Sequence, residues 1–272
     1  MSLNRWSSVI VLVGLLSCEV GLMSSTAKAA GVTLPSSYWK FDGDTSDETG
    51  AGRDLSLVGG AGLGVGLFGQ GLDLTGRDAG TFANRSVDDS IFDVGGTDFS
   101  FQLWVNYSSL GGEQVLAEKW TGAGGPGWTL TKLSNSQFRF HFDSLALDSG
   151  SQTLFSGVWN HFLARRAGND FDLFLNGTPI ISVNSLAGVA VTDVSDTLLI
   201  GQRNTADGRN FSSDARFDEI AFWNSALSDA DVATLYNGGL GQEITAVPEP
   251  TSLSAVLAGL VGLAARRRKT RG

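Results

Sequence analysis

Strict alternation of apolar and polar residues is the feature that most constrains the fold of this chain. In residues 99–107, FSFQLWVNY, every odd-numbered position is apolar or aromatic, and the even-numbered positions are polar except for Trp104. The same period of two recurs in 137–143 and 171–175. Successive side chains of a strand point to opposite faces, so this period predicts strands with one buried face. The residues that we expect in the core are Phe101, Leu103, Phe140, Leu173, Ile220 and Phe222.

One segment near the end of the patterned region predicts a helix instead. Ser228 can cap it, and Val232, Leu235 and Tyr236 form its apolar stripe, after which Gly238 can end it. The chain has no repeat of fixed period, which argues against a propeller or a solenoid. Many strands with one short helix predict an all-β fold, an antiparallel two-sheet sandwich with one short helix near the C-terminal end of the domain.

The first 29 residues have the three parts of a signal peptide. Arg5 is basic, residues 9–16 are apolar, and residues 27–29, Ala-Lys-Ala, fit a small-x-small cleavage pattern. An alternative is lipidation of Cys18, which follows Leu-Leu-Ser as in a lipobox. Both alternatives export the protein.

The last 26 residues form a second segment with three parts. The motif Pro248-Glu249-Pro250 precedes an apolar run over 253–265, and the basic run 266–271 follows. The apolar run is shorter than the roughly 20 residues that a stable membrane helix prefers. Basic residues at its end favour a cytoplasmic location for that end. The chain therefore divides into a signal peptide (1–29), one folded domain (30–246) and a tail (247–272).

This tail resembles the PEP-CTERM sorting signal of Gram-negative bacteria. The resemblance implies processing by an exosortase-type membrane protease and transient anchoring of the tail in the inner membrane. It also implies a final location at the cell envelope, the cell surface or the extracellular matrix, among exopolysaccharide. The alternative is an ordinary C-terminal membrane anchor.

The charge of the folded domain restricts its partners. Residues 30–246 contain 26 acidic and 12 basic side chains, an excess of 14 negative charges. Such a domain should repel nucleic acid, so we expect no nucleic-acid partner. The carboxylates could attract a hard cation such as Ca²⁺, or they could serve only solubility. Cys18 is the only cysteine and the chain has two histidines, which excludes a disulfide in the domain and a zinc site of three histidines.

The order of several short blocks in the domain resembles a known family. The blocks are Tyr38–Gly43, Gly69–Leu74, Phe99–Val105, Val158–Phe162 and Phe217–Trp223. Together they resemble the LamG-like jelly roll of the concanavalin A-like lectin/glucanase superfamily, over nearly all of residues 35–240. The resemblance implies that the sandwich is a jelly roll.

Members of that superfamily often hold one Ca²⁺ on the outer face of the sandwich. The resemblance implies Asp218 as a ligand, with Asp42 or Asp44 opposite. The residues themselves agree in part, because Asp42, Asp44 and Asp47 lie in one Gly-containing segment and oxygen ligands suit Ca²⁺. The alternatives are that this segment is only a turn and that Asp218 pairs with Arg216 or caps a loop.

Catalytic patterns are missing from the sequence. Glycoside hydrolysis usually needs two carboxylates that face one groove. In a regular strand the neighbours Asp218 and Glu219 point to opposite faces. The chain lacks both a Gly-x-Ser-x-Gly motif and the Glu-x-Asp-x-x-Glu pattern of the superfamily's glucanases. We therefore predict that the protein is not an enzyme.

Exposed aromatic side chains are the expected carbohydrate platforms. Trp120 and Trp128 lie in the Gly-rich segment 119–128, and binding residues concentrate on such loops. The alternative is that both indoles pack on a sheet. These features predict an exported, non-catalytic binding or adhesion module that engages extracellular polysaccharide or matrix. The alternatives are a structural spacer that binds no glycan and a glycan-cleaving enzyme.

Overall fold

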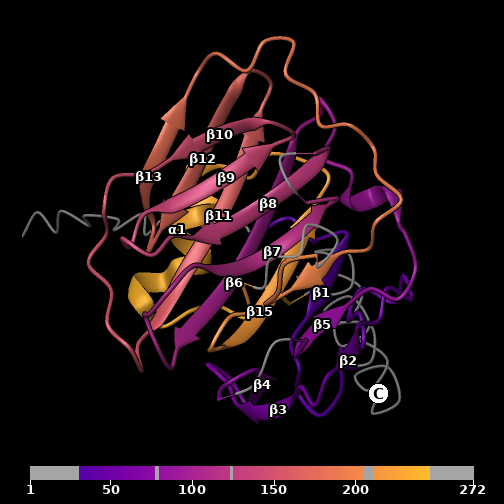
Figure 1. Ribbon diagram of the computed structural model, residues 1–272, viewed down its shortest axis with the longest axis vertical. Helices are drawn as coiled ribbons and strands as arrows, with labels where there is room; N and C mark the ends of the chain where they lie inside the picture. Colours follow the sequence, from indigo (N-terminus) through magenta and orange to yellow (C-terminus); the bar gives the residue numbers. More distant parts are fainter. Residues whose placement is uncertain (1–30, 77–79, 123–124, 205–210, 246–272) are drawn as a thin grey trace, which may run out of the picture. The chain divides into compact units, whose positions relative to one another are not determined.

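The computed structural model of the protein describes residues 31–76, 80–122, 125–204 and 211–245 (Figure 1). The predicted signal peptide with Cys18 and the tail with Pro248, Glu249 and Pro250 lie outside the described residues. The described part contains no helix with the length and apolar character needed to span a membrane.

Two antiparallel sheets make up the domain. The larger sheet has the strand order β13-β12-β11-β6-β15-β4-β3, and β1 also pairs with β15. Its strands are β1 (Ser37–Trp39), β3 (Gly62–Val65), β4 (Gln70–Asp73), β6 (Phe99–Tyr107), β11 (Trp159–Ala167), β12 (Asp170–Leu175), β13 (Thr178–Val183) and β15 (Ala215–Trp223).

The smaller sheet has the order β10-β9-β8-β7-β14-β5-β2. Its strands are β2 (Ser56–Val58), β5 (Phe82–Asn84), β7 (Gln114–Trp120), β8 (Gly127–Lys132), β9 (Phe138–Phe142), β10 (Leu145–Asp148) and β14 (Leu199–Ile200). Three short helical segments complete the described elements: η1 (Ser90–Phe92), α1 (Asp229–Tyr236) and η3 (Asn237–Gly239). The predicted fold class, an antiparallel two-sheet sandwich with one short helix, is confirmed.

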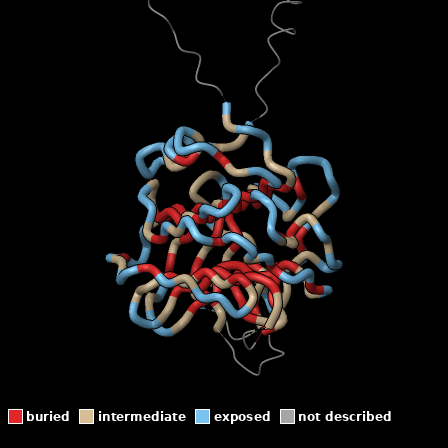
Figure 2. The backbone as a smooth tube through the Cα atoms, turned by 90° about the horizontal axis from the view of Figure 1, so that it is seen from above, coloured by how far each residue is buried: buried red, intermediate tan, exposed pale blue. Residues whose placement is uncertain are grey.

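The main core lies between the two sheets. It is dominated by aromatic and aliphatic residues that alternate along the strands, and in Figure 2 buried stretches cross the middle of the domain while exposed stretches run mostly around its outside. Each such side chain contributes roughly 1.5–3 kcal/mol when it leaves water. All six residues predicted for the core are buried: Phe101, Leu103, Phe140, Leu173, Ile220 and Phe222.

A second apolar cluster covers much of the outer face of the larger sheet. Leu163, Ala221 and Trp223 point outward from β11 and β15 and pack against Val232 and Leu235 of α1. The helix begins as predicted, at a capping box in which Ser228 and Asp231 bond reciprocally, and it ends at Asn237 in the left-handed region. The sheet therefore has apolar contacts on both faces along part of its length.

Strand β15 changes its partner halfway along the larger sheet. Residues 216–217 pair with β4, and residues 220–222 pair with β1. Between these two pairings the register with β6 shifts between Asp218 and Ala221, which is a β-bulge. Glu219, inside the bulge, has a φ of 50°, which is unusual for a residue other than Gly.

Candidate functional site

Asp42 and Asp218 lie on either side of the connection between β3 and β4. The Asp218 carboxylate accepts hydrogen bonds from the amides of Leu67 (2.7 Å) and Phe68 (3.1 Å), and Asp42 accepts one from the amide of Gln70 (2.8 Å). Both carboxylates lie close to this connection: a Cβ at Gly69 would lie 1.9 Å from Asp42 Oδ1, and a Cβ at Gly66 would lie 2.6 Å from Asp218 Oδ2. The structure thus brings together two of the three predicted metal ligands.

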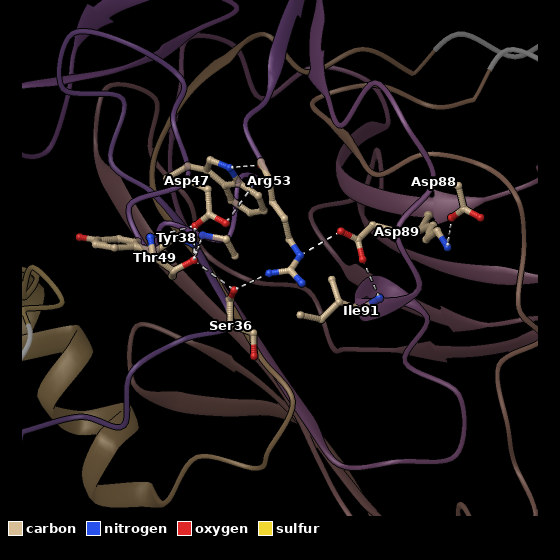
Figure 3. Close-up of polar contacts among 11 residues, drawn as sticks. Ser36, Tyr38, Asp47, Thr49, Arg53, Asp88, Asp89 and Ile91 are labelled. Carbon is tan, nitrogen blue, oxygen red and sulfur yellow. Dashed lines mark hydrogen bonds and ion pairs between the residues drawn. The ribbon is translucent and has the colours of Figure 1, made fainter.

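Asp44 and Asp47 do not join them. Asp44 is exposed, and its carboxylate accepts a hydrogen bond from the amide of Ser46 at 2.9 Å. Asp47 is buried and accepts from the amide of Tyr38 (3.1 Å) and from the amide of Thr49 (3.0 Å), as Figure 3 shows. Among the described residues there is no group of three His, Cys, Asp or Glu side chains placed to hold a metal ion.

The bulge in β15 overturns the expectation that Asp218 and Glu219 point to opposite faces. Asp218 is registered with Trp104, whose ring stacks on Tyr236 at the end of α1, so it faces outward. Glu219 Oε2 accepts a hydrogen bond from the hydroxyl of Tyr38, which belongs to the second, outer cluster. The alternation rule fails here because a bulge adds a residue to one strand.

Both carboxyl groups are difficult to ionise. Burial raises the pKa of Asp218 to about 7, against the effect of three backbone amides, and the nearby charge of Asp42 raises it further. Burial raises the pKa of Glu219 to about 8, and the charge of Asp218 adds to that shift. Glu219 is 1% exposed, so the pair lies beneath the surface, where a substrate does not reach it.

Trp128 lies in the core, and the expectation that it stands exposed in a loop is wrong. Its side chain is 1% exposed, its indole Nε1 donates to the carbonyl of Phe92 at 2.8 Å, and its ring stacks on Phe140 at 5.9 Å. The reason is that the hairpin of β7 and β8 extends to the pair Trp120–Gly127, so Trp128 is a strand residue.

Trp120 faces outward from the smaller sheet but is also covered. It is 3% exposed and lies between His141, stacked at 5.1 Å, and the guanidinium of Arg203, 4.6 Å from the ring centre. Its Nε1 donates to the carbonyl of Gly125 at 2.5 Å. Its expected exposure is therefore wrong as well, since His141 and Arg203 already pack on the ring.

An ion pair lies beside Trp120 on the outer face of the smaller sheet. Arg203 Nε donates to Glu118 Oε2 at 3.1 Å, and both side chains are at least 97% buried, with exposures of 3% and 0%. Arg203 Nη2 also donates to Thr131 at 3.2 Å. A buried carboxylate that accepts hydrogen bonds from a guanidinium and from the amide of Asn204 suits a structural role.

A cavity of about 520 Å³ continues this outer face toward the strands β14, β5 and β2. In the register of the sheet, Leu199 stands next to both Glu118 and Asn84, so these residues share one face. The lining that matters for binding is partly exposed and combines an aromatic ring, apolar groups and polar groups: Phe82, Val58, Leu199, Asn84, Asp196 and Asn204. We call this feature the sheet cavity.

Sequence reasoning missed the sheet cavity, although one signal was available. The polar residues that alternate with core residues, such as Arg139 and His141 in β9, mark a polar outward face of the smaller sheet. Nothing in the local pattern joins Arg203 to Glu118, because 85 positions separate them.

The fold and the cavity together define an antiparallel sandwich with a ligand-sized recess on one outer face. Residues 78–233 match the family Laminin_G_3, described as the concanavalin A-like lectin/glucanases superfamily, and this span is more than half of the chain. The chain belongs to this superfamily. No curated protein sequence matches it.

Several solved structures share the fold. Domain 4 of AbnA, an extracellular GH43 arabinanase from Geobacillus stearothermophilus solved with arabinotriose, superposes with a TM-score of 0.60 and 17% identity, over 78% of this chain and 100% of that one. The binding domain of Paraclostridial Mosquitocidal Protein 1 superposes with a TM-score of 0.57 and 18% identity, over 71% of this chain and 49% of that one. Trypanosoma rangeli sialidase superposes with a TM-score of 0.57 and 18% identity, over 79% of this chain and 34% of that one. The chain thus spans about half of the toxin domain and a third of the sialidase.

Proposed function

We propose that the protein is an exported, non-catalytic module that binds extracellular polysaccharide through the sheet cavity. The observation that carries the proposal is the lining of that cavity, in which Phe82 offers a ring face beside the amides of Asn84 and Asn204. A volume of about 520 Å³ lies within the range of small-ligand sites. The arabinanase domain solved with arabinotriose supports the choice of ligand class.

Binding without catalysis is the better interpretation of the charged groups. Glu118 is neutralised by Arg203, and Asp196 accepts a hydrogen bond from Asn204 at 3.0 Å. Asp218 and Glu219 are buried on the larger sheet, away from the sheet cavity. Hydrolysis needs an acid and a second carboxylate that face the same sugar bond.

Titration of the full-length chain with a panel of neutral trisaccharides tests this function. The panel contains arabinotriose, xylotriose, cellotriose, maltotriose and mannotriose. We expect at least one to bind, with affinity reduced about tenfold or more in Phe82→Ala and in Asn84→Ala. Leu145→Ala, an exposed apolar residue at the other edge of the same sheet, is the matched control and should bind normally. Release of reducing sugar from any of these compounds would favour an enzyme instead.

We also propose one Ca²⁺ held by Asp218 and Asp42. Two carboxylates approach the same turn, and one of them, Asp218, is fully buried. The nearest cationic side chain among the described residues is Lys40, whose Nζ lies 3.8 Å from Asp42 Oδ2. Such a pair of oxygen donors suits a hard cation, which would hold both groups in their charged forms. Asp44 is not among the ligands that we now propose.

The ends of the chain carry the proposed route of export. We propose cleavage after residue 29, sorting through Pro248, Glu249 and Pro250 by an exosortase-type protease, and transient anchoring of the tail in the inner membrane. Mass spectrometry of the native protein tests this route. Loss of residues 1–29 and of the segment after the motif supports it, whereas an intact C-terminus in a soluble extracellular fraction contradicts it. A lipidated Cys18 would support the alternative N-terminus.

A further inference from the structure

Four side chains form a row across the outer face of the larger sheet, on the opposite side of the sandwich from the sheet cavity. In register, Asp73 of β4 lies beside Arg216 of β15, Arg216 beside Asn106 of β6, and Asn106 beside Trp159 of β11. Residues paired in adjacent strands share a face. We call Asp73, Arg216, Asn106 and Trp159 the outer row.

The outer row begins where the apolar cover of the sheet ends. The neighbouring row holds Trp104 and His161, which are buried and lie against Tyr236. In the outer row, by contrast, Asn106 and Trp159 are partly exposed, and the side chain of Arg216 is 38% exposed. A cavity of about 340 Å³ opens over Asn106 and Arg216.

The polar groups of the outer row retain hydrogen-bonding capacity. Arg216 pairs with Asp73 through its buried Nε, which lies 3.5 Å from Asp73 Oδ2, while the side chain as a whole is 38% exposed and lines the cavity. Within the part of the chain that the structure describes, the side-chain amide of Asn106 has no hydrogen-bond partner, and Ser108 and Ser156 also line the cavity. Donors and acceptors thus lie side by side, as recognition of neighbouring sugar hydroxyls requires.

Trp159 adds an apolar surface at one end of the row. Adjacent strands are about 4.8 Å apart, so three steps from Asp73 to Trp159 span roughly 14 Å. That length suits an oligosaccharide, with one sugar ring packed on the indole and others near Asn106 and Arg216. An acidic sugar fits less well, because Asp73 is part of the row and the folded domain carries an excess of 14 negative charges.

We propose that the outer row is a second saccharide site, specific for a neutral oligosaccharide, so that one chain can hold two polysaccharide strands on opposite faces. The proposal rests on the glycan binding proposed above. It gives the module the ability to cross-link a matrix, which a single site cannot provide.

Calorimetric titration of the full-length chain with the same neutral trisaccharides tests the second site, and trigalacturonate serves as the acidic comparison. The wild type should bind two molecules of at least one neutral trisaccharide. Trp159→Ala and Asn106→Ala should each bind one, with affinity at the outer row reduced about tenfold or more. Phe155→Ala, an aromatic residue that is 65% exposed and outside the row, should still bind two.

The outcomes separate this proposal from the first one. One bound molecule, lost in Phe82→Ala and unchanged in Trp159→Ala, would overturn the second site and leave the sheet cavity in place. Binding lost in Trp159→Ala and unchanged in Phe82→Ala would support the outer row and overturn the sheet cavity. Asn106→Ala keeps the test valid if Trp159→Ala fails to fold. Preference for trigalacturonate would contradict the neutral specificity, and no binding of any compound would contradict both sites.

Discussion

The outer faces of the two sheets differ in what covers them. On the larger sheet, Leu163, Ala221 and Trp223 point outward and α1 packs on them. On the smaller sheet the corresponding outward positions hold Glu118, Thr129 and other polar residues, with no helix among the described residues packed over them. The same alternation therefore produces an apolar outer face covered by a helix in one sheet and a polar outer face, with the sheet cavity at one end, in the other.

The outward side chains of a sheet determine whether a second layer covers that face or a ligand can bind to it. Apolar residues at alternate outward positions need a second layer, because leaving them in water forfeits roughly 1.5–3 kcal/mol for each large side chain. Polar outward residues need hydrogen bonds instead, and those that lack them can bind a ligand. The outer row lies on the larger sheet at the place where apolar outward residues give way to polar ones.

The largest expected difference between the faces concerns stability. Trp223→Ala should lower the free energy of unfolding by about 3–5 kcal/mol, because it removes a buried ring between the larger sheet and α1. Thr129→Ala on the smaller sheet should cost about 1 kcal/mol, through the lost contact with Thr131 at 3.1 Å. Urea denaturation measures both. Equal losses would contradict the division into an apolar and a polar outer face.

Each face also carries one histidine, fully buried His161 and partly buried His141, and acid should destabilise both faces. Burial lowers the pKa of His161, on the larger sheet, to about 3 and that of His141, on the smaller sheet, to about 4. Below pH 6.5 the histidines of the unfolded chain bind protons that the same histidines do not bind in the native state. The free energy of unfolding therefore falls as the pH drops toward these pKa values. A shift of this size at His161 is worth on the order of 4 kcal/mol, and less at the more exposed His141.

Denaturation at several pH values between 7 and 4 measures this dependence. His161→Gln should flatten the acid branch more than His141→Gln does, because its histidine is fully buried. An unchanged acid branch in both variants would show that other groups control the pH dependence.

Much of this contrast could be predicted from the sequence. Alternation identified the core residues, and it also identified the outward residues, which lie between them in the same strands. Two features could not be predicted. The bulge at Glu219 breaks the alternation without a local marker, so both carboxyls face outward. The Gly-rich segment before Trp128 suggested that both tryptophans lie in a loop, whereas β7 extends to Trp120 and β8 begins at Gly127, which places Trp128 in a strand and in the core.

Calcium should stabilise the larger sheet at its bulge. At a free Ca²⁺ concentration 100 times the dissociation constant, binding to the native state alone adds about 2.7 kcal/mol. Melting in Ca²⁺ should therefore exceed melting in chelator, and Asp218→Asn should abolish the difference. Asp44→Asn is the matched control, because Asp44 is exposed and bonds to Ser46 instead. Identical melting curves of the wild type in both conditions would remove the proposed site.

The smallest expected effects concern the ion pairs on the two faces. Arg139 and Asp148 pair at 2.6 Å on the smaller sheet, but both are about one-third exposed, at 33% and 37%. Arg139→Gln should therefore cost less than about 1 kcal/mol. Arg165 on the larger sheet is 14% exposed, pairs with Asp172 and lies over Phe174, so Arg165→Gln should cost about 2 kcal/mol. Urea denaturation that ranks the two variants in the opposite order would contradict this difference in burial.

The most direct test of the sheet cavity as the binding site is a crystal structure of the protein with the neutral trisaccharide that binds most tightly. The expected result is a sugar ring against Phe82, with hydroxyls hydrogen-bonded to Asn84 and Asn204 at about 2.7–3.2 Å. A fully occupied ligand elsewhere on the domain, with the sheet cavity empty, would contradict the proposed site.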